Sequence, residues 1–267
     1  MRSVFNIGVG LIKSRGAHSS AVDPRPRAKM CKELKTKVLH LLPPTSNGPS
    51  AQHEGHTDGA EILSCTVRAL KEGHVVAVPT DTIYGLACLA QSSAAIRRVY
   101  DIKGRSGQKP LAICVGDIQD IYKYCKVQVK EELLGDLLPG PVTLVFERSE
   151  ILNPDLNPFT PLVGVRIPDH AFMRRLCQMC KEPLALTSAN ISTHTSTVAV
   201  HEFQDLWPSL AVVVDGGPIG DQSRLGSTVI DLSVLGKYRV IRPGCALSAT
   251  VDVLERKYGL SKDPGED

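Results

Sequence analysis

The stretch VVAVPTDTIYGLACLA, residues 75–90, decides how this chain folds. An apolar run ends at Pro79, a Thr-Asp-Thr turn follows at residues 80–82, and a second apolar run begins at Leu86. A buried strand that ends in two hydroxyls and a carboxylate places polar groups at the edge of a sheet. Ligands of sheet proteins gather at such strand ends. We therefore expect residues 80–82 to belong to a binding site.

The remaining sequence alternates between helical and strand patterns. Apolar residues with helical spacing predict helices at residues 58–72, 93–102, 117–125, 130–138, 170–180, 199–206 and 248–258. Short apolar runs predict strands at residues 74–79, 110–116, 141–148, 162–168, 210–217, 227–233 and 238–244, and the stretch PLALTSAN (183–190) begins as a further strand. Because helix–strand alternation is mixed with consecutive strands, we expect one α/β domain with a twisted mixed sheet.

The formal charge of +3 is distributed unevenly along the chain. Residues 1–55 contain nine Lys or Arg and three Asp or Glu, so they carry +6 and leave −3 for the rest. No acidic residue precedes Asp23, and basic residues there are interspersed with apolar residues and serines. This composition is typical of a mitochondrial transit peptide, and a disordered basic tail is the alternative. We expect cytoplasmic and mitochondrial pools, with Met30 available as an internal start.

The sequence divides into three parts. We assign residues 1–55 to the basic extension and a linker rich in Pro, Ser and Gly, residues 56–248 to the α/β domain, and residues 249–267 to a C-terminal helix and tail. No apolar run approaches the ~20 residues of a membrane span, so we expect no transmembrane segment. The eight cysteines are scattered, and Cys177 and Cys180 form the one CxxC pair. Since a zinc site needs further ligands, we expect neither zinc nor a disulfide.

Polar residues follow four of the predicted strands, whereas the GxxxxGK[ST] and GxGxxG phosphate motifs are absent from the sequence. These polar strand ends are residues 80–82, Arg166, residues 187–190 and Arg242. Lys103 and Arg105 add two cations after a predicted helix. Hydroxyls and amides beside cations suit a zwitterionic ligand together with a polyanionic one. Taken singly, each stretch also fits ordinary turn and helix-end chemistry.

Seven of these stretches resemble, in order, the YrdC-type threonylcarbamoyl-AMP synthase family. They are PTDTIYGLAC, KGRSGQKPLAI, LLPGPVTLV, VGVRIPDH, LTSANIS, GSTVIDLS and IRPG, within residues 58–245. The resemblance is strongest to the animal members, which carry this domain behind an N-terminal extension. It implies a twisted α/β sheet around a deep cavity lined by positive charge. The activity it implies is that of a nucleotidyltransferase, which joins L-threonine, bicarbonate and ATP into threonylcarbamoyl-AMP and pyrophosphate.

The resemblance also implies roles for individual residues. The family's catalytic Lys-x-Arg and Ser-x-Asn tetrad matches Lys103, Arg105, Ser188 and Asn190. Its L-threonine site matches Thr82, Cys114, Arg166, Ser188 and Ser227, where Arg166 would hold the substrate carboxylate and Cys114 stands where some relatives carry histidine. Its nucleotide site matches Arg105, Lys109, Asn190, Thr228 and Arg242.

The chemistry implied by the resemblance agrees with the residue types. A carbamate and the α-phosphate of ATP are both anionic, so cations such as Lys103, Arg105 and Arg242 would have to offset their repulsion. We expect Mg²⁺ to enter with ATP rather than through direct protein ligands. No general base stands out, which phosphoryl-type chemistry tolerates. Thr80, Asp81 and Thr82 would help to hold threonine, because a buried polar partner for its hydroxyl discriminates against analogues that lack one.

Two other classes of function stay open at this point. One is a module that binds double-stranded RNA or tRNA through the same cations. The −3 charge of the body and the single tryptophan, Trp207, argue against it. The other is a regulatory or membrane-associated interaction protein that works through residues 1–55. For the enzyme, we expect the product to pass to a tRNA threonylcarbamoyl-transferase complex, with only indirect or weak contact to tRNA.

Overall fold

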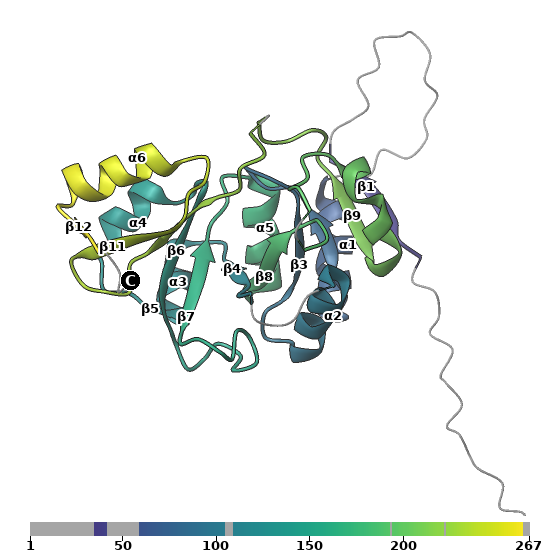
Figure 1. The fold of residues 1–267 in the computed structure, drawn as a ribbon. Coiled ribbons are helices and arrows are strands. Elements are labelled where there is room, and N and C mark those ends of the chain that lie inside the picture. Colours follow the sequence, from purple (N-terminus) through teal and green to yellow (C-terminus); the bar gives the residue numbers. More distant parts are fainter. Residues whose placement is uncertain (1–34, 42–58, 105–108, 193, 222, 264–267) are drawn as a thin grey trace, which may run out of the picture. The chain divides into compact units, whose positions relative to one another are not determined.

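A mixed β-sheet organises the part of the chain that the structure describes (Figure 1). This computed structural model describes residues 35–41, 59–104, 109–192, 194–221 and 223–263. The strands follow the order β1-β9-β2-β3-β8-β4-β7-β6-β10-β11-β12, and β5 pairs with β6. Five of the strand pairings are parallel and six are antiparallel. The expectation of an α/β fold with a mixed sheet is therefore confirmed.

The helices and strands have the following bounds. The strands are β1 (Lys37–His40), β2 (Val76–Val78), β3 (Gly85–Leu89), β4 (Ala112–Cys114), β5 (Cys125–Lys126), β6 (Val142–Arg148), β7 (Leu162–Arg166), β8 (Leu184–Ser188), β9 (Val212–Asp215), β10 (Thr228–Asp231), β11 (Lys237–Arg242) and β12 (Ser261–Lys262). The helices are α1 (Gly59–Lys71), α2 (Ser93–Lys103), α3 (Ile118–Tyr124), α4 (Glu131–Leu137), α5 (Ala171–Cys180), the 3₁₀ segment η1 (Val200–Ser209), α6 (Leu247–Asp252) and the π-helical turn η2 (Val253–Lys257).

The predicted helices are confirmed at nearly the predicted residues, with two differences in type. The segment predicted at 199–206 is a 3₁₀ helix, and the closing helix predicted at 248–258 changes from α to π at Val253. The predicted strands are present but shorter. Strand β3 lies in the second apolar run, which we did not assign to a strand. Strands β5 and β12 also lie outside the predicted strands, because two-residue strands carry too little periodicity to be recognised.

The sheet begins earlier in the chain than the boundary we set at residue 56. Strand β1 pairs in parallel with β9, and the Thr36 hydroxyl donates to the carbonyl of Trp207 over 2.5 Å. Val38 and Leu39 pack against the cores on opposite faces of the sheet. The assignment of all residues 1–55 to an extension and linker is thus wrong for β1, which is an edge strand of the domain.

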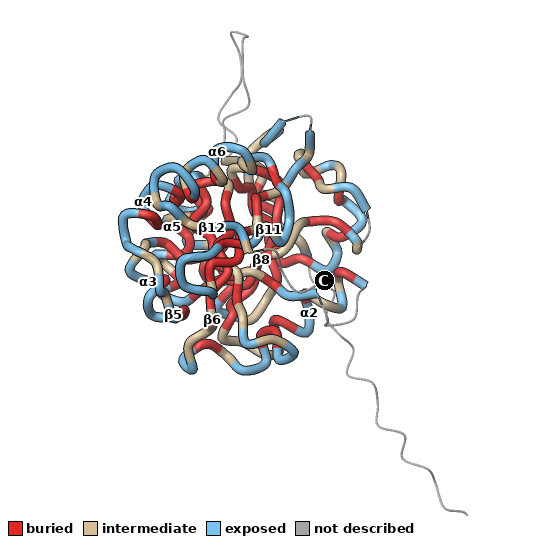
Figure 2. The backbone as a smooth tube through the Cα atoms, turned by 60° about the vertical axis from the view of Figure 1, so that its left-hand side comes forward, coloured by how far each residue is buried: buried red, intermediate tan, exposed pale blue. Residues whose placement is uncertain are grey.

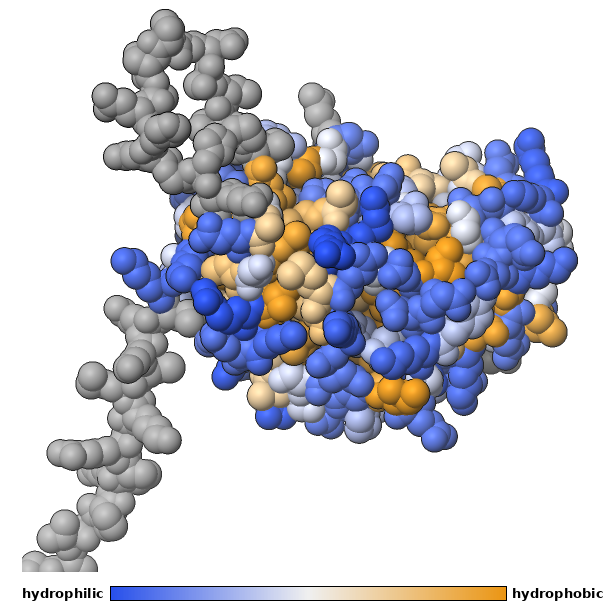
Figure 3. All heavy atoms as spheres, turned by 180° about the vertical axis from the view of Figure 1, so that it is seen from behind, coloured by the Kyte–Doolittle hydropathy of each residue, from blue (hydrophilic) through white to orange (hydrophobic). Residues whose placement is uncertain are grey.

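Helices cover the sheet on both faces. On one face α1 and α5 pack against β2, β3 and β8 through residues such as Leu70, Met173 and Leu186. On the other face α2, α3 and α4 pack through residues such as Val99 and Leu134. Figure 2 shows that buried residues gather in the middle of the domain and exposed residues at its periphery. On the side seen in Figure 3, apolar side chains reach the surface in patches bordered by hydrophilic ones.

Candidate functional site

A cavity of about 590 Å³ lies on the sheet face that also carries α1 and α5. Its floor contains small residues, among them Ala112 of β4 and Gly164 of β7. A Cβ added at Gly164 would lie 2.9 Å from Cγ2 of Thr143 on the neighbouring strand β6. Larger side chains at these positions would fill the space that the cavity occupies.

The polar lining of the cavity is cationic. Among the described residues it contains two lysines, two arginines and no carboxylate. Its polar members are Thr80, Lys103, Lys109, Thr143, Thr160, Arg166, Thr187, Ser188, Asn190, Ser192, Ser227 and Arg242. A concave site lined by charges of one sign raises the local concentration of ligands with the opposite charge. The cavity therefore suits an anionic ligand.

Lys103 forms one wall together with the end of β8. It is the last residue of α2, and Gly104 follows in the left-handed conformation at φ 58°. Glycine adopts this conformation without steric cost, so the helix ends there. The Lys103 ammonium is 1% exposed and donates to the Ser188 carbonyl over 2.6 Å, to the Ser188 hydroxyl over 3.3 Å and to Asn190 Oδ1 over 3.2 Å. Three of the four predicted tetrad residues thus lie in contact.

Asn190 is fixed by further hydrogen bonds. Its side-chain amide donates to the carbonyls of Ile191 over 3.0 Å and His194 over 2.6 Å. These bonds orient Oδ1 towards Lys103, since the amide nitrogen is engaged on the other side. The fourth tetrad residue, Arg105, lies outside the described residues.

Arg166 and the Thr-Asp-Thr turn form a second group. The Arg166 guanidinium pairs with the Asp81 carboxylate and donates to the Thr82 hydroxyl over 2.9 Å. The other oxygen of Asp81 accepts from the Asp169 backbone N–H over 3.0 Å. The Thr80 hydroxyl donates to the Ile83 carbonyl over 2.8 Å, which closes the turn. The turn therefore holds Arg166 in position at the end of β7.

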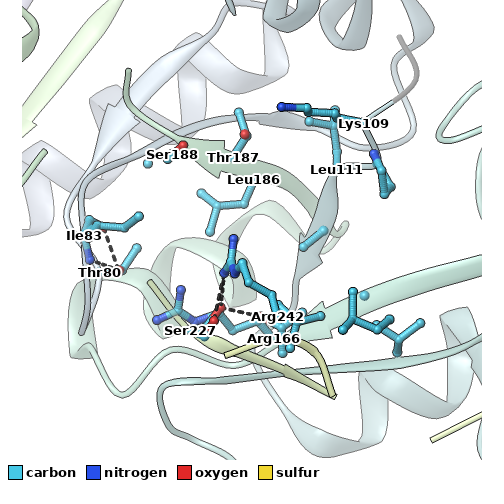
Figure 4. A pocket seen from close by; sticks show the side chains of 18 of the residues that line it. Thr80, Ile83, Lys109, Leu111, Arg166, Leu186, Thr187, Ser188, Ser227 and Arg242 are labelled. Atoms are coloured by element: carbon cyan, nitrogen blue, oxygen red, sulfur yellow. Dashed lines mark hydrogen bonds between the residues drawn. The ribbon is translucent and has the colours of Figure 1, made fainter. Parts of the chain in front are cut away.

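Arg242 and Ser227 lie beside Arg166 in the cavity wall (Figure 4). Arg242 donates to the carbonyl and the hydroxyl of Ser227 over 2.8 and 3.3 Å, and the Ser227 hydroxyl lies 2.7 Å from that of Thr143. Partial burial and the nearby charge of Arg166 both lower the pKa of the Arg242 guanidinium. Two guanidinium groups near each other, with Asp81 engaged by one of them, form a site for an anion such as a carboxylate or a phosphate.

Figure 4 shows the two groups facing one another across the cavity, with Ser188, Thr187 and Lys109 opposite Arg166, Arg242 and Ser227. The backbone carbonyl of Lys109 accepts from the Tyr100 hydroxyl over 3.2 Å. Because the two groups come from distant parts of the sequence, a ligand between them would contact several strand ends at once.

Three predicted site residues do not line the cavity. Thr82 is 3% exposed and reaches the site through its hydrogen bonds with Arg166 and Thr80, which both line the cavity. Cys114 is fully buried in the core beneath α5, and this burial raises the pKa of its thiol to about 12. Thr228 is fully buried, and its hydroxyl accepts from the Ala246 N–H over 3.1 Å before α6. Direct contact of these side chains with a ligand is not supported in this arrangement.

Three polar lining residues were not singled out in the sequence: Thr143, Thr160 and Ser192. Thr143 lies on β6 within a run of buried residues that is otherwise apolar, so no alternating pattern marked it in the sequence. The others lie at strand ends or in loops, where spacing carries no directional information. The hydroxyl of Ser192 is buried and has no hydrogen-bond partner among the described residues.

Neither a metal centre nor a membrane span is found in the part of the chain that the structure describes. There, no three His, Cys, Asp or Glu side chains gather in a way that would hold a metal ion. No helix in that part is long and apolar enough to cross a bilayer.

Comparisons with known proteins agree with this picture. The family model Sua5/YciO/YrdC, described as "Telomere recombination", matches residues 68–244, which include every lining residue of the cavity. Human threonylcarbamoyl-AMP synthase is 55% identical over 264 residues, covering 97% of this chain and 94% of the human protein. The rat protein of the same name is 59% identical over 270 residues, covering 99% of this chain and 96% of that protein.

A solved structure shows that the fold of this chain is also similar to that of a Sua5 protein. The crystal structure of Pyrococcus abyssi Sua5 complexed with L-threonine aligns with a TM-score of 0.67 and 26% sequence identity. The alignment covers 86% of this chain and 62% of the archaeal one. The chain thus spans somewhat less than two thirds of that archaeal protein.

Proposed function

The chain belongs to the Sua5/YciO/YrdC family, and from this premise we propose that its cavity makes threonylcarbamoyl-AMP from L-threonine, bicarbonate and ATP. Pyrophosphate is the other product. The observation that carries the proposal is the pair of facing groups in the cavity, Lys103 with the end of β8 and Arg166 with Arg242. The product serves the threonylcarbamoyladenosine modification of tRNA. This reading favours an enzyme over the RNA-binding and interaction modules that the sequence left open.

L-Threonine binds on the Arg166 side of the cavity. The guanidinium donates to the substrate carboxylate, because its Nε is buried and has no partner among the described residues. Asp81 and Thr82 hold the guanidinium from behind. The likeness to an archaeal protein solved with L-threonine supports this assignment.

ATP binds with its phosphates between the two groups. Arg242 lies on one side and Lys109 on the other, and Arg105 is proposed to reach the same phosphates from the segment after Lys103. The amine of threonine attacks the carbon of bicarbonate and releases water, giving a carbamate. A carbamate oxygen then attacks the α-phosphorus and the bond to pyrophosphate breaks. The residues act mainly by positioning the reactants and offsetting negative charge.

Mg²⁺ is proposed to enter with the ATP phosphates. The described cavity lining offers no carboxylate, and Asp81 is engaged by Arg166, so the residues fit a metal carried by the nucleotide rather than a protein-bound one. When bound, the ion would neutralise charge on the leaving pyrophosphate. Lys109 and Arg242 would bind the phosphate oxygens that do not bind the ion.

Two proposals concern the cell rather than the cavity. The product passes to a tRNA threonylcarbamoyl-transferase complex, and contact with tRNA itself is indirect or weak. The protein works in the cytoplasm and in mitochondria, with the basic residues before Asp23 as the targeting signal. Fusion of residues 1–34 to a fluorescent reporter tests the targeting, and a wholly cytosolic reporter would contradict it.

The enzymatic proposal is tested with ATP, L-threonine and labelled bicarbonate, by following an acid-labile adenylate. Arg105→Ala should lower kcat/KM at least about tenfold, since a charge-assisted hydrogen bond contributes about 1.5–3 kcal/mol. Arg105→Lys should recover only part of the loss, because it lacks the bidentate fork. An unmodified protein that forms no adenylate would refute the function. Full activity of Arg105→Ala would refute the role of that residue alone.

A further inference from the structure

The loop between β6 and β7, residues 149–161, is tied down along its length. The Arg148 guanidinium donates to three of its carbonyls, those of Leu152, Asn153 and Leu156. The Asn153 side-chain amide donates to the Ala90 carbonyl and the Ser93 hydroxyl, each over 3.1 Å. A segment without helix or strand is therefore held in place by hydrogen bonds, most of them from side chains to main-chain carbonyls.

Asn157 fixes the end of the loop that is nearer the cavity. It is fully buried and adopts a left-handed backbone conformation with φ 52°, which asparagine tolerates better than most residues. Its Oδ1 accepts from the Leu111 N–H over 2.8 Å, and its Nδ2 donates to the Leu111 carbonyl over 2.9 Å. The side chain thus pairs with both main-chain groups of Leu111, as a neighbouring strand would do.

This pairing lies directly behind the cavity wall. Leu111 is 1% exposed and immediately precedes β4, so its main-chain groups would be buried without partners if Asn157 were removed. Lys109, Pro110 and Leu111 all line the cavity, whereas Asn157 does not. Thr160, three residues beyond Asn157, lines the same cavity. Asn157 therefore touches the wall only from behind.

We infer that Asn157 is a positioning residue, which holds the Lys109–Leu111 wall at the distance that the ATP phosphates require. The inference rests on the proposed function, because it assigns Lys109 to the nucleotide. Asn157 makes no contact with Arg166 or Arg242 through any of its hydrogen bonds. It acts on the nucleotide side of the cavity and leaves the threonine side unchanged.

Two variants separate hydrogen bonding from backbone strain. Asn157→Gly keeps the left-handed conformation without strain and removes both bonds to Leu111. Asn157→Asp keeps the acceptor for the Leu111 N–H but sets an oxygen against the Leu111 carbonyl. Asn153→Ala is the matched control, since it loosens the same loop at the end that contacts Ala90 and Ser93. Each is purified as the full chain.

Binding of ATP and of L-threonine is measured separately by calorimetry, together with thermal unfolding. Asn157→Gly should weaken ATP binding by about tenfold, the effect of losing roughly one to two hydrogen bonds. Asn157→Asp should weaken ATP binding at least as much, because a buried carboxylate oxygen then faces the Leu111 carbonyl, and the Kd for threonine should stay unchanged in both. Asn153→Ala should lower the Tm and leave both Kd values unchanged.

The inference is overturned if ATP binding by both Asn157 variants equals that of the unmodified protein. It is also overturned if the Kd values for ATP and threonine rise together, because this would mean general loosening. If Asn157→Gly does not fold, Asn157→Asp decides by the same comparison. Because binding is measured without turnover, an unmodified protein that binds ATP but forms no adenylate would refute the proposed function and leave this inference standing.

Discussion

The Lys103 ammonium lies 2.6 Å from the main-chain oxygen of Ser188, although the two residues are 85 positions apart in the sequence. This bond joins the end of α2 to the end of β8. It also places a buried positive charge beside two polar side chains of the LTSANIS stretch, Ser188 and Asn190.

Replacement of Lys103 by Met should therefore affect both activity and stability. The Ser188 carbonyl and Asn190 Oδ1 lose a charged donor, and hydrogen bonds to charged groups contribute about 1.5–3 kcal/mol each. We expect kcat/KM for adenylate formation to fall at least about tenfold and the Tm to fall as well. Lys123→Met, at an exposed site of α3, should change neither. Unchanged activity of Lys103→Met would remove this residue from the tetrad.

Replacement of Asp81 by Asn should act on the threonine side. The carboxylate pairs with Arg166 and accepts from the Asp169 N–H. A neutral amide would no longer offset the positive charges of the two nearby guanidinium groups, those of Arg166 and Arg242. We expect KM for L-threonine to rise about tenfold with a smaller change in KM for ATP.

Asp169→Asn is the control for that experiment. Its carboxylate pairs with Arg174 on the surface at 2.8 Å, where an ion pair contributes about 0–1 kcal/mol. Steady-state kinetics with each substrate varied in turn makes the comparison. Equal threonine KM values in the Asp81 and Asp169 variants would mean that Asp81 does not orient Arg166.

His170 should make stability depend on pH. Its Nδ1 is buried without a partner among the described residues. Burial lowers the pKa of the imidazole, and the charge of Arg174 adds to this effect. The carboxylates of Asp81 and Asp169 act in the opposite direction but do not cancel it. The folded state therefore favours neutral His170. As the pH falls below the ordinary value of about 6.5, the unfolded state takes up the proton first, and the free energy of unfolding decreases.

The measurement is denaturant unfolding at about pH 7.5 and about pH 5.5, on either side of the ordinary histidine pKa. His170→Leu should show a smaller decrease between the two pH values than the unmodified protein. Other titrating groups contribute equally to both proteins, so the difference isolates His170. An identical decrease in both would show that His170 titrates normally in the folded protein.

The cysteines should separate into two classes of reactivity. Cys245 is exposed and Cys65 partly exposed, whereas burial raises the pKa of Cys88, Cys114 and Cys125 to about 12. In a Cys31→Ser background, which removes the cysteine outside the described residues, a disulfide reagent should titrate two thiols rapidly and the others only after unfolding. Rapid reaction of more than two thiols would contradict this division. Reaction of fewer than seven thiols after unfolding without reductant would indicate a disulfide and would also contradict it.

Truncations should locate the true start of the folded unit. Removal of residues 1–34 leaves β1 in place, so we expect an unchanged Tm and full catalytic activity. Removal of residues 1–41 deletes β1, its pairing with β9 and the hydrogen bond from Thr36 to Trp207. We expect this shorter chain to unfold at a lower temperature. Equal Tm values for the two truncations would mean that β1 contributes nothing to stability.

The sequence predicted most helices and most of the central strands, because their apolar periodicity spans several turns or strand residues. It also predicted, through the resemblance to a known family, that Lys103, Ser188 and Asn190 belong together, and the structure confirms their contact. Motif residues are recognisable because they lie in short fixed stretches. Strand β1 was missed because its four residues directly precede Leu41, Leu42 and the Pro-rich stretch that we assigned to the linker, and they carry too little pattern to indicate a partner.

Only the tertiary structure decided which polar residues reach the cavity. Cys114 and Ala112 share one face of β4, yet α5 covers the former while the latter lines the cavity. Thr228 sits between two lining residues, Ser227 and Val229, and its hydroxyl turns to Ala246 instead. Alternation along a strand fixes which face a side chain takes, but what covers that face depends on helices far away in the sequence. For the same reason, the bonds from Asn157 to Leu111 were visible only once the chain had folded.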